Sequence, residues 1–328
     1  MDATPTPPPP KRLRRPRWLE HLLVAAVAVV FTLVRLLPLG VARWAARTIG
    51  RLIYFVGGPG FMGVQRNLRI AFGPELDGRR ARELARAFWV HIAQSTVEAL
   101  QLSAWTRENC AWHLELAEPE QLAAFRSRGC GVIIISGHIG SWEVGQYGLA
   151  LLGYPIRPLY NPGTSAPLSE YLKGERERSG MQVLSRLEHP WALKKALDRG
   201  AWLCIAGDLN AGRRAEFVPF FGVQASTYLT PAALQQATGC PILVVTTARQ
   251  TDGRHRLKIW RVLEAQGTAD RHADLLKTMG DVHEGLEEAI RAFPEQWLWT
   301  YRRWRSRPPG ETAGLDGLPP RLENTGRP

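Results

Sequence analysis

The sequence lacks motifs that would place it in several large classes of enzyme. Its 328 residues contain no Gly-x-x-x-x-Gly-Lys-Ser/Thr loop and no His-Glu-x-x-His, so neither a nucleotide-binding P-loop nor a zinc-peptidase helix is indicated. Its four cysteines share no metal-ligand spacing, and a disulfide framework is implausible in so long a chain. We therefore expect reduced thiols in a cytosol-facing domain, and neither a metal nor a redox cofactor.

The N-terminal region lacks an apolar run long enough for an ordinary membrane crossing. The uninterrupted run Leu22–Val34 has 13 residues, whereas a crossing needs about 20. The run resembles a signal peptide without a clear cleavage site. Basic residues flank it on both sides, and a single span would leave one group outside, against the positive-inside tendency. We therefore expect an in-plane or re-entrant anchor in preference to a single span.

Negative charge is also scarce, with 30 acidic against 42 basic residues and a formal charge of +12. The excess predicts an acidic partner, and nucleic acid, anionic lipid and an acidic carrier protein all fit it. Beyond the apolar run, four arginines would share one side of a helix and form a basic amphipathic stripe: Arg35, Arg43, Arg47 and Arg51.

Composition divides the chain into four parts. Residues 1–17 are rich in proline and then basic, and should be disordered. Residues 18–57 form the membrane-anchoring amphipathic segment, and residues 58–305 form the main domain. Residues 306–328, rich in proline and glycine, should be a loose tail.

The main domain predicts an α/β fold with a mostly parallel central sheet flanked by helices, because strand-like runs alternate with helical stretches. The expected strands are GVIIIS, PIRPLY, WLCIAG, PILVVTTA and RLKIWRV. The expected helices cover residues 77–102, 141–152, 165–180, 190–199, 230–238 and 271–292.

The stretch GVIIISGHIGSWEVG places a histidine and a glutamate at the end of an apolar strand. Functional groups gather beyond the carboxyl ends of strands in such sheets. His138 can take a proton from an alcohol near neutral pH, and a carboxylate on its other ring nitrogen would fix the tautomer. Glu143 could supply that carboxylate if His138 lies in the loop before the helix. A loop histidine and an ordinary helix-end charge remain the alternative.

Other interpretations of this stretch are weaker. Ser141 lacks the Gly-x-Ser-x-Gly frame of hydrolases, because Ile139 holds the first glycine position. Gly137 to Gly140 match the Gly-x-x-Gly loop of KH domains, but that pattern is short and common.

Six ordered motifs resemble the lipid A biosynthesis acyltransferases, the lauroyl and myristoyl transferases, within the His-x4-Asp/Glu lysophospholipid acyltransferase group. The resemblance runs from about residue 18 to residue 308. The motifs are GHIGSWE (137–143), YPIRPLYNP (154–162), GERERSG (174–180), AGDLNAG (206–212), EFVPFFG (216–222) and PEQWLWTYRRWRSRP (294–308). The resemblance implies a glycerolphosphate-acyltransferase-like sheet with an N-terminal membrane-anchoring helix.

The resemblance also implies roles for particular residues. His138 and Glu143 would be catalytic, and four residues would bind substrate: Arg157, Arg176, Arg178 and Asp208. Asp208 follows a strand and could orient one of the arginines, although Leu209 stands where the family usually has glutamine.

Two further groups have plausible roles beside plain packing or solvation. Phe217, Phe220 and Phe221 are candidates for an acyl-chain groove, since such pockets are mostly apolar. Arg302, Arg303 and Arg305, beside the tryptophan-rich segment, suit a lipid head-group surface.

The implied reaction transfers a fatty acyl chain from an acyl-carrier-protein thioester, or from acyl-CoA, to a hydroxyl of a lipid A precursor. It needs no cofactor. The implied partners are acyl-carrier protein, the glycolipid and membrane lipids, not nucleic acid, at the cytoplasmic face of the bacterial inner membrane. Phosphatidylinositol mannoside or a lysophospholipid remains an alternative acceptor. A non-catalytic basic protein that binds membranes or nucleic acid is the alternative from another class.

Overall fold

The computed structural model describes residues 16–161, 165–186, 188–213, 215–314 and 317–322. The predicted N-terminal tail therefore lies, except for its last two residues, outside the described part of the chain. The four cysteines are free, as expected.

The domain is α/β, as predicted. Within the described ranges, seven strands form one sheet in the order β1-β9-β8-β2-β5-β3-β4. Of these neighbours, β8 and β9 pair antiparallel and the others pair parallel. Their bounds are β1 (Leu114–Leu116), β2 (Val132–Ser136), β3 (Ile156–Tyr160), β4 (Leu184–Ser185), β5 (Trp202–Ala206), β8 (Ile242–Arg249) and β9 (His255–Leu263). A separate hairpin, β6 (Glu216–Phe220) and β7 (Val223–Thr227), has no counterpart among the predicted strands.

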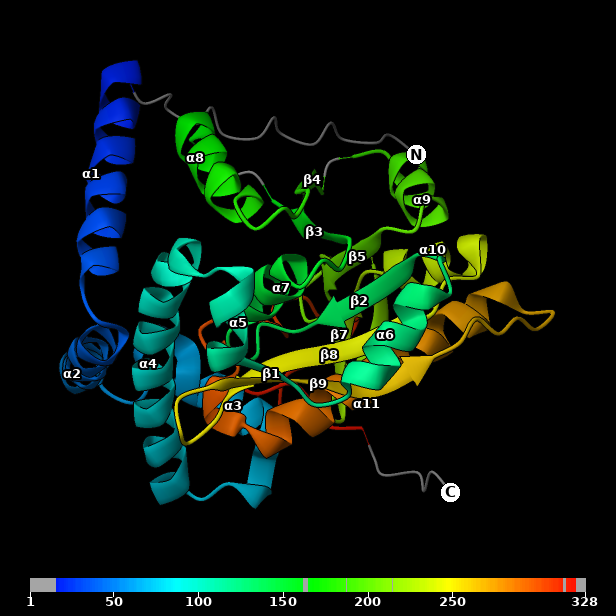
Figure 1. Cartoon of the computed structure of the whole chain (residues 1–328). Helices are drawn as coiled ribbons and strands as arrows, with labels where there is room; N and C mark the ends of the chain where they lie inside the picture. The colour runs from blue at the N-terminus through cyan, green and yellow to red at the C-terminus, as the bar shows by residue number, and fades with distance from the viewer. Residues whose placement is uncertain (1–15, 162–164, 187, 214, 315–316, 323–328) are drawn as a thin grey trace.

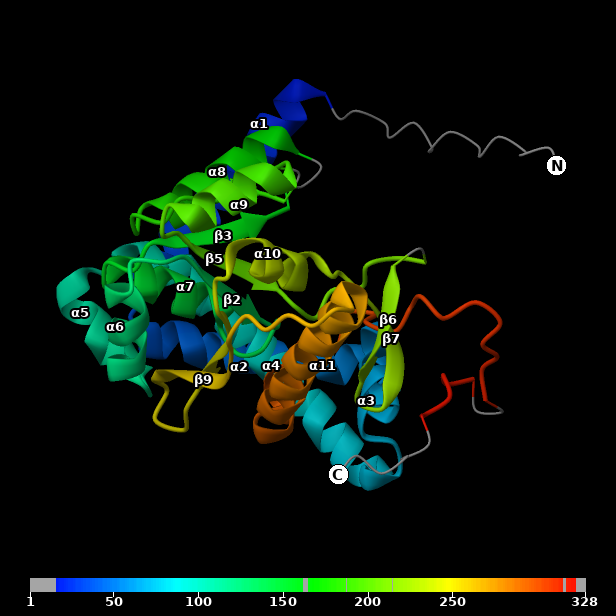
Figure 2. The same ribbon diagram turned by 90° about the vertical axis from the view of Figure 1, so that its right-hand side faces the viewer.

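Helices cover both faces of the sheet, with α5, α6 and α7 on one side and α10 and α11 on the other (Figures 1 and 2). The helices of the domain are α3 (Val64–Phe72), α4 (Gly78–Gln101), α5 (Arg107–His113), α6 (Pro119–Ser127), α7 (Trp142–Leu151), α8 (Ala166–Glu177), α9 (Pro190–Asp198), α10 (Thr230–Thr238) and α11 (Arg271–Ala292). Each helix predicted from the sequence is present, and α3, α5 and α6 are additional.

Strand β2 lies in the middle of the sheet and is buried on both faces. Val132 and Ile134 join the hydrophobic cluster beneath α5, α6 and α7. Ile133 and Ile135 join the cluster that contains α10 and α11. Successive side chains of a strand point to opposite faces, so a strand covered on both sides needs a continuous apolar run. That requirement explains the sequence VIIIS.

The N-terminal segment forms two helices rather than one continuous element. Pro38 separates α1 (Arg17–Leu36) from α2 (Leu39–Gly57), because proline cannot continue the helix and biases Leu37 toward extended backbone. By length and composition, the 19 residues Trp18–Leu36 could cross a membrane, and only 6% of that apolar window is buried. Whether α1 spans or lies in the plane stays a prediction.

The break also changes the predicted arginine stripe. Arg35 lies on α1 and forms an ion pair with Glu175 of α8. Arg43 turns inward from α2 and pairs with Glu98 of α4 at 2.7 Å. Only Arg47 and Arg51 remain as exposed members of the stripe, since the other two are used to hold the helices to the domain.

The described part of the segment after residue 305 is held against the domain, unlike the loose tail predicted. Arg307 forms an ion pair with Glu311 and donates a hydrogen bond to the carbonyl of Gln224. Arg321 donates to the carbonyls of Ile70 and Ala71. Side-chain contacts of this kind leave no periodic signal in the sequence.

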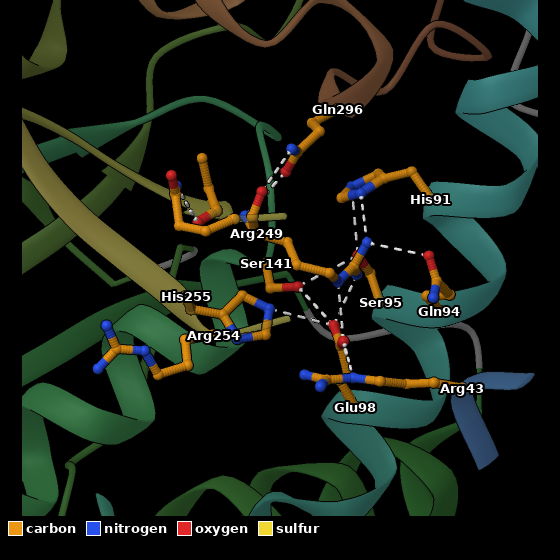
Figure 3. A network of polar contacts seen from close by, with 12 residues as sticks. Arg43, His91, Gln94, Ser95, Glu98, Ser141, Arg249, Arg254, His255 and Gln296 are labelled. Atoms are coloured by element: carbon orange, nitrogen blue, oxygen red, sulfur yellow. Dashed lines mark hydrogen bonds and ion pairs between the residues drawn. The ribbon is translucent and has the colours of Figure 1, made fainter. Parts of the chain in front are cut away.

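A buried carboxylate joins the N-terminal helices to the sheet (Figure 3). Glu98 of α4 accepts two hydrogen bonds from Arg249, at 2.8 and 2.6 Å, and one from Arg43. His255 lies 3.1 Å from it, and the Ser141 hydroxyl donates to it at 3.2 Å. Burial opposes its negative charge, but these partners outweigh burial and hold the pKa of Glu98 well below its usual range. Glu98 is therefore a buried anion that ties α2, α4, β8, β9 and the start of α7 together.

We expect Glu98→Ala to lower the free energy of unfolding by about 3–5 kcal/mol, because it leaves the buried Arg249 without its carboxylate. Glu83→Ala on the same helix is the matched control, since Glu83 makes only exposed ion pairs with Arg79 and Arg80. Denaturant unfolding of the detergent-solubilised protein, followed by tryptophan fluorescence, would measure both. Equal unfolding midpoints would show that Glu98 is not the structural centre of this cluster.

Candidate active site

Two neighbouring strands bring His138 and Asp208 together. Strands β2 and β5 run parallel, with Ser136 opposite Ala206 in the register. Each strand continues through a glycine, so His138 and Asp208 both follow two residues beyond this pair. The His138 Nδ1 and Asp208 Oδ1 atoms are 2.8 Å apart, and the backbone amide of His138 donates to Asp208 Oδ2 at 2.7 Å. The parallel register therefore creates the contact.

Asp208 is buried yet ionised. It is 2% exposed, and Trp297 Nε1 donates to its Oδ2 at 2.8 Å. Burial alone would raise the pKa of Asp208, but the charge and hydrogen bonds of His138, with the Trp297 bond, lower it to about 2. A carboxylate held in this way fixes the Nδ1–H tautomer of a neighbouring histidine and leaves Nε2 to accept a proton.

The same pair sets the basicity of His138. Burial lowers its pKa, but the charge and hydrogen bond of Asp208 and the charge of Glu143 outweigh burial, so the pKa is raised above its ordinary value. The imidazole packs against Trp142 with ring centroids 4.9 Å apart. His138 is thus a stronger base than a free histidine, in a fixed orientation.

The loop that carries His138 is held by residues distant in the sequence. Gly140 donates its amide to the carbonyl of Gln296, and the carbonyl of His138 accepts from the amide of Leu298. Gly140 has a φ of +64°, and a Cβ there would meet the carbonyl oxygen of Thr247 at 2.0 Å. Only glycine fits that position. Ser141 then contacts Glu98, so the buried carboxylate also supports the loop (Figure 3).

Glu143 lies in the first turn of α7, as predicted, while His138 lies in the preceding loop. The carboxylate does not take the predicted place on the imidazole. Arg176 of α8 donates to Glu143 through Nε at 2.9 Å and through Nη2 at 2.5 Å, a bidentate pair. The prediction that Asp208 orients an arginine is also wrong. The two carboxylates have exchanged their expected partners: Asp208 contacts His138, and Glu143 contacts Arg176.

A cavity of about 550 Å³ opens beside His138. His138, Glu143 and Arg176 form part of its wall, while Leu23 of α1 and Leu168 and Leu172 of α8 are among its apolar lining. An apolar cavity with a few convergent polar groups is the usual form of a small-molecule or lipid site. A helix of the N-terminal segment therefore forms part of this cavity.

Other predicted site residues lie outside this cavity. Arg157 of β3 is not among its described lining residues, and Arg178 is largely exposed, 3.3 Å from Glu175. Phe220 and Phe221 are core residues, at 0% and 2% exposure, and Phe217 lies half-buried on β6. The apolar lining of the cavity comes from other elements, because the β6–β7 hairpin packs against α11.

The predicted head-group surface near the C-terminal motif is also different. Arg303 is fully buried and donates to the carbonyl of Ser226 and to Thr227 Oγ1. Burial lowers its pKa to about 10. Trp297, Trp299 and Trp304 are likewise in the core. Arg302 and Arg305 are exposed, so only these two can face a head group.

Cys204 of β5 also lines the cavity, but burial raises the pKa of its thiol to about 12. It is protonated at neutral pH and is a poor nucleophile. No cluster of three or more metal-ligating side chains occurs among the residues that the structure describes.

Sequence reasoning missed the residues that support the loop, chiefly Glu98, Arg249 and Gln296. One signal was available for Glu98. His91, Gln94, Ser95 and Glu98 recur at helical spacing on α4, a polar row on a face that also carries core residues.

Comparison with known proteins identifies the family of the chain. The model of the bacterial lipid A biosynthesis acyltransferase family matches residues 10–306. The lipid A biosynthesis lauroyltransferase of Escherichia coli is 27% identical over 252 residues, covering 75% of this chain and 79% of that protein. The palmitoleoyltransferase of the same organism is 25% identical over 76% of this chain and 80% of its own length. The family match, over residues 10–306, spans the strands, the cavity and the His138 loop, and the chain belongs to the bacterial lipid A biosynthesis acyltransferases.

Proposed function

We propose that this acyltransferase moves a fatty acyl chain from an acyl thioester to a hydroxyl of a lipid A precursor, with His138 as general base. The observation that carries the mechanism is the 2.8 Å contact between His138 Nδ1 and Asp208 at the wall of the cavity. The family membership and the names of the relatives supply the acceptor class.

The reaction follows from the free ring nitrogen. Nε2 of His138 takes the proton of the acceptor hydroxyl as its oxygen attacks the thioester carbonyl. The tetrahedral intermediate collapses with cleavage of the carbon–sulfur bond, and the imidazolium returns the proton to the departing thiolate. An ester and a free thiol result. Asp208 stabilises the imidazolium between the two steps and does not itself take the proton.

Arg176 is positioned to stabilise negative charge. Its Nη1 is buried without a hydrogen-bond partner among the described residues, and the guanidinium forms part of the cavity wall. The amides of His138 and Gly140 are already bonded to Asp208 and Gln296. We therefore assign oxyanion or head-group binding to Arg176 in preference to those two amides. Glu143 fixes the guanidinium in this place.

The net charge of the chain supports the choice of acyl donor, and the apolar helix α1 supports a location at a membrane. A net charge of +12 complements the acidic surface of acyl-carrier protein, which we propose as the donor. Leu23 of the apolar helix α1 lines the cavity, so an acyl chain of a membrane lipid could enter without crossing water. We propose that the enzyme acts at the cytoplasmic face of the inner membrane.

We expect His138→Ala to lower kcat by about 10²–10⁴, the usual contribution of a general base. Purified protein in detergent would be given acyl-carrier-protein thioesters of several lengths and a lipid A precursor, and product masses recorded. His272→Ala, at an exposed position of α11, is the matched control. If thioester cleavage depends on His138 but no acylated lipid A precursor forms, the acceptor would be another bacterial lipid. Full activity of His138→Ala would overturn the mechanism.

The pH profile separates the role of Asp208 from that of Glu143. The reaction needs neutral His138, so kcat/KM should rise with pH through an apparent pKa above 6.5. Asp208→Asn removes the attraction that raises this pKa, so the midpoint should move to lower pH and the plateau should fall by about 10²-fold or more.

Glu143→Gln should move the midpoint less, in the same direction, because Glu143 acts on His138 only through its charge. Its main effect should come from loss of the Arg176 pair: a higher KM if Arg176 binds the head group, or a lower kcat if Arg176 binds the oxyanion. A larger midpoint shift for Glu143→Gln than for Asp208→Asn would restore the sequence-based assignment of Glu143 to the imidazole.

A further inference from the structure

A second hollow, of about 560 Å³, lies between α2, α4 and the turn that follows β8. It shares no lining residue with the cavity beside His138. His91, Gln94 and Arg249 are among its lining residues, and Figure 3 shows His91 and Gln94 of α4 beside the guanidinium of Arg249. Arg249 Nη1 lies 3.1 Å from His91 Nδ1 and 3.4 Å from Gln94 Oε1. The Gln94 Nε2 donor is buried with no hydrogen-bond partner among the described residues.

Three exposed arginines form the rim of this hollow: Arg47 and Arg51 from α2, and Arg86 from α4. None of them has a carboxylate partner within the described part of the chain. Of the two acidic residues that share the lining, Glu83 pairs with Arg79 and Arg80, whereas Glu295 accepts a hydrogen bond from the neutral side-chain amide of Gln296 and keeps its charge. The three rim guanidinium groups therefore outnumber the carboxylate that is left without a cationic partner, and guanidinium groups match the oxygens of a phosphate.

The exposed face of α2 adjoins this rim and is apolar. Helical neighbours lie three or four positions apart, so Arg47 adjoins Trp44 and Arg51 adjoins Phe55. Trp44 is 68% exposed and Phe55 is 84% exposed. The apolar face continues through four further exposed side chains, Val41, Ile49, Leu52 and Val56. An apolar helix face bordered by arginines is the arrangement of a helix that lies in a membrane surface.

We propose that this hollow binds the phosphate head group of an anionic membrane phospholipid, separately from the acyl-transfer cavity. The phosphate would lie among Arg47, Arg51 and Arg86, with its acyl chains along the apolar face of α2. An acidic protein would satisfy the arginines but leave that apolar face in water. A phospholipid satisfies both, which is why we commit to it.

The test counts lipids bound to the full-length, detergent-solubilised protein by native mass spectrometry. Phosphatidylglycerol, zwitterionic phosphatidylcholine and inorganic phosphate would be titrated separately. The variant is the triple substitution Arg47→Gln, Arg51→Gln and Arg86→Gln. The matched control, with the same loss of charge on exposed arginines away from the hollow, is Arg107→Gln, Arg199→Gln and Arg271→Gln.

We expect one phosphatidylglycerol to bind preferentially, and the rim variant to bind it on the order of 100-fold more weakly at low salt, since each arginine near an anionic lipid contributes several-fold. The control should bind as the unchanged protein does. If the control variant binds phosphatidylglycerol as weakly as the rim variant does, the loss of binding comes from net charge alone, and the proposal is overturned. Inorganic phosphate binding as tightly as the lipid would overturn the lipid assignment.

Acyl transfer measured in detergent without phospholipid separates this site from the catalytic one. The rim variant should keep its kcat and its KM for the lipid A precursor there, because no rim residue lines the cavity. A raised KM for the precursor would show that the hollow holds the acceptor itself and would overturn the separate site. Loss of His138-dependent chemistry in the unchanged protein would instead contradict the acyl-transfer mechanism and leave the lipid site standing.

Discussion

The buried carboxylate of Asp208 is the constraint on which the candidate active site depends. It bonds the imidazole, the backbone amide of His138 and the indole of Trp297. A buried anion is costly unless such partners surround it. The loop after β2, the loop after β5 and the C-terminal motif must therefore meet at one point. Once they do, the tautomer, orientation and basicity of His138 are set together.

Two ion pairs support the His138 loop from opposite sides. Glu143 and Arg176 connect the start of α7 to α8 and place a guanidinium on the cavity wall. Glu98 and Arg249 lie on the other side, behind Ser141, and bind the sheet to the N-terminal helices. The loop is thus held between a pair that faces the cavity and a pair that faces the interior, and each needs its partner because both charges are largely removed from water.

The sequence predicted the framework well, because periodicity reports burial. The run VIIIS predicted a strand, and His138 was correctly placed between that strand and a helix. Assignment of partners was less successful, because spacing along the chain favoured Glu143, five residues away, over Asp208, seventy residues away. The repeated pattern of strand, glycine and polar residue in IIISGH and CIAGD contained the needed information. It becomes readable only once β2 and β5 are known to be parallel neighbours in register. Burial of Arg303 and Glu98 could not be predicted, since both residue types are usually exposed.

The bonds from Gln296, Trp297 and Leu298 to the His138 loop have a consequence for synthesis. The ribosome makes the chain from its N-terminus, so the apolar helix α1 and the sheet strands β2 and β5 emerge long before these residues. Until residue 298 has been translated and released, Asp208 lacks its indole and the loop lacks its backbone partners. A nascent chain therefore has His138 without the contacts that orient it. Under the proposed mechanism, chain completion and activation coincide, and prematurely terminated products that end before this motif would be inactive.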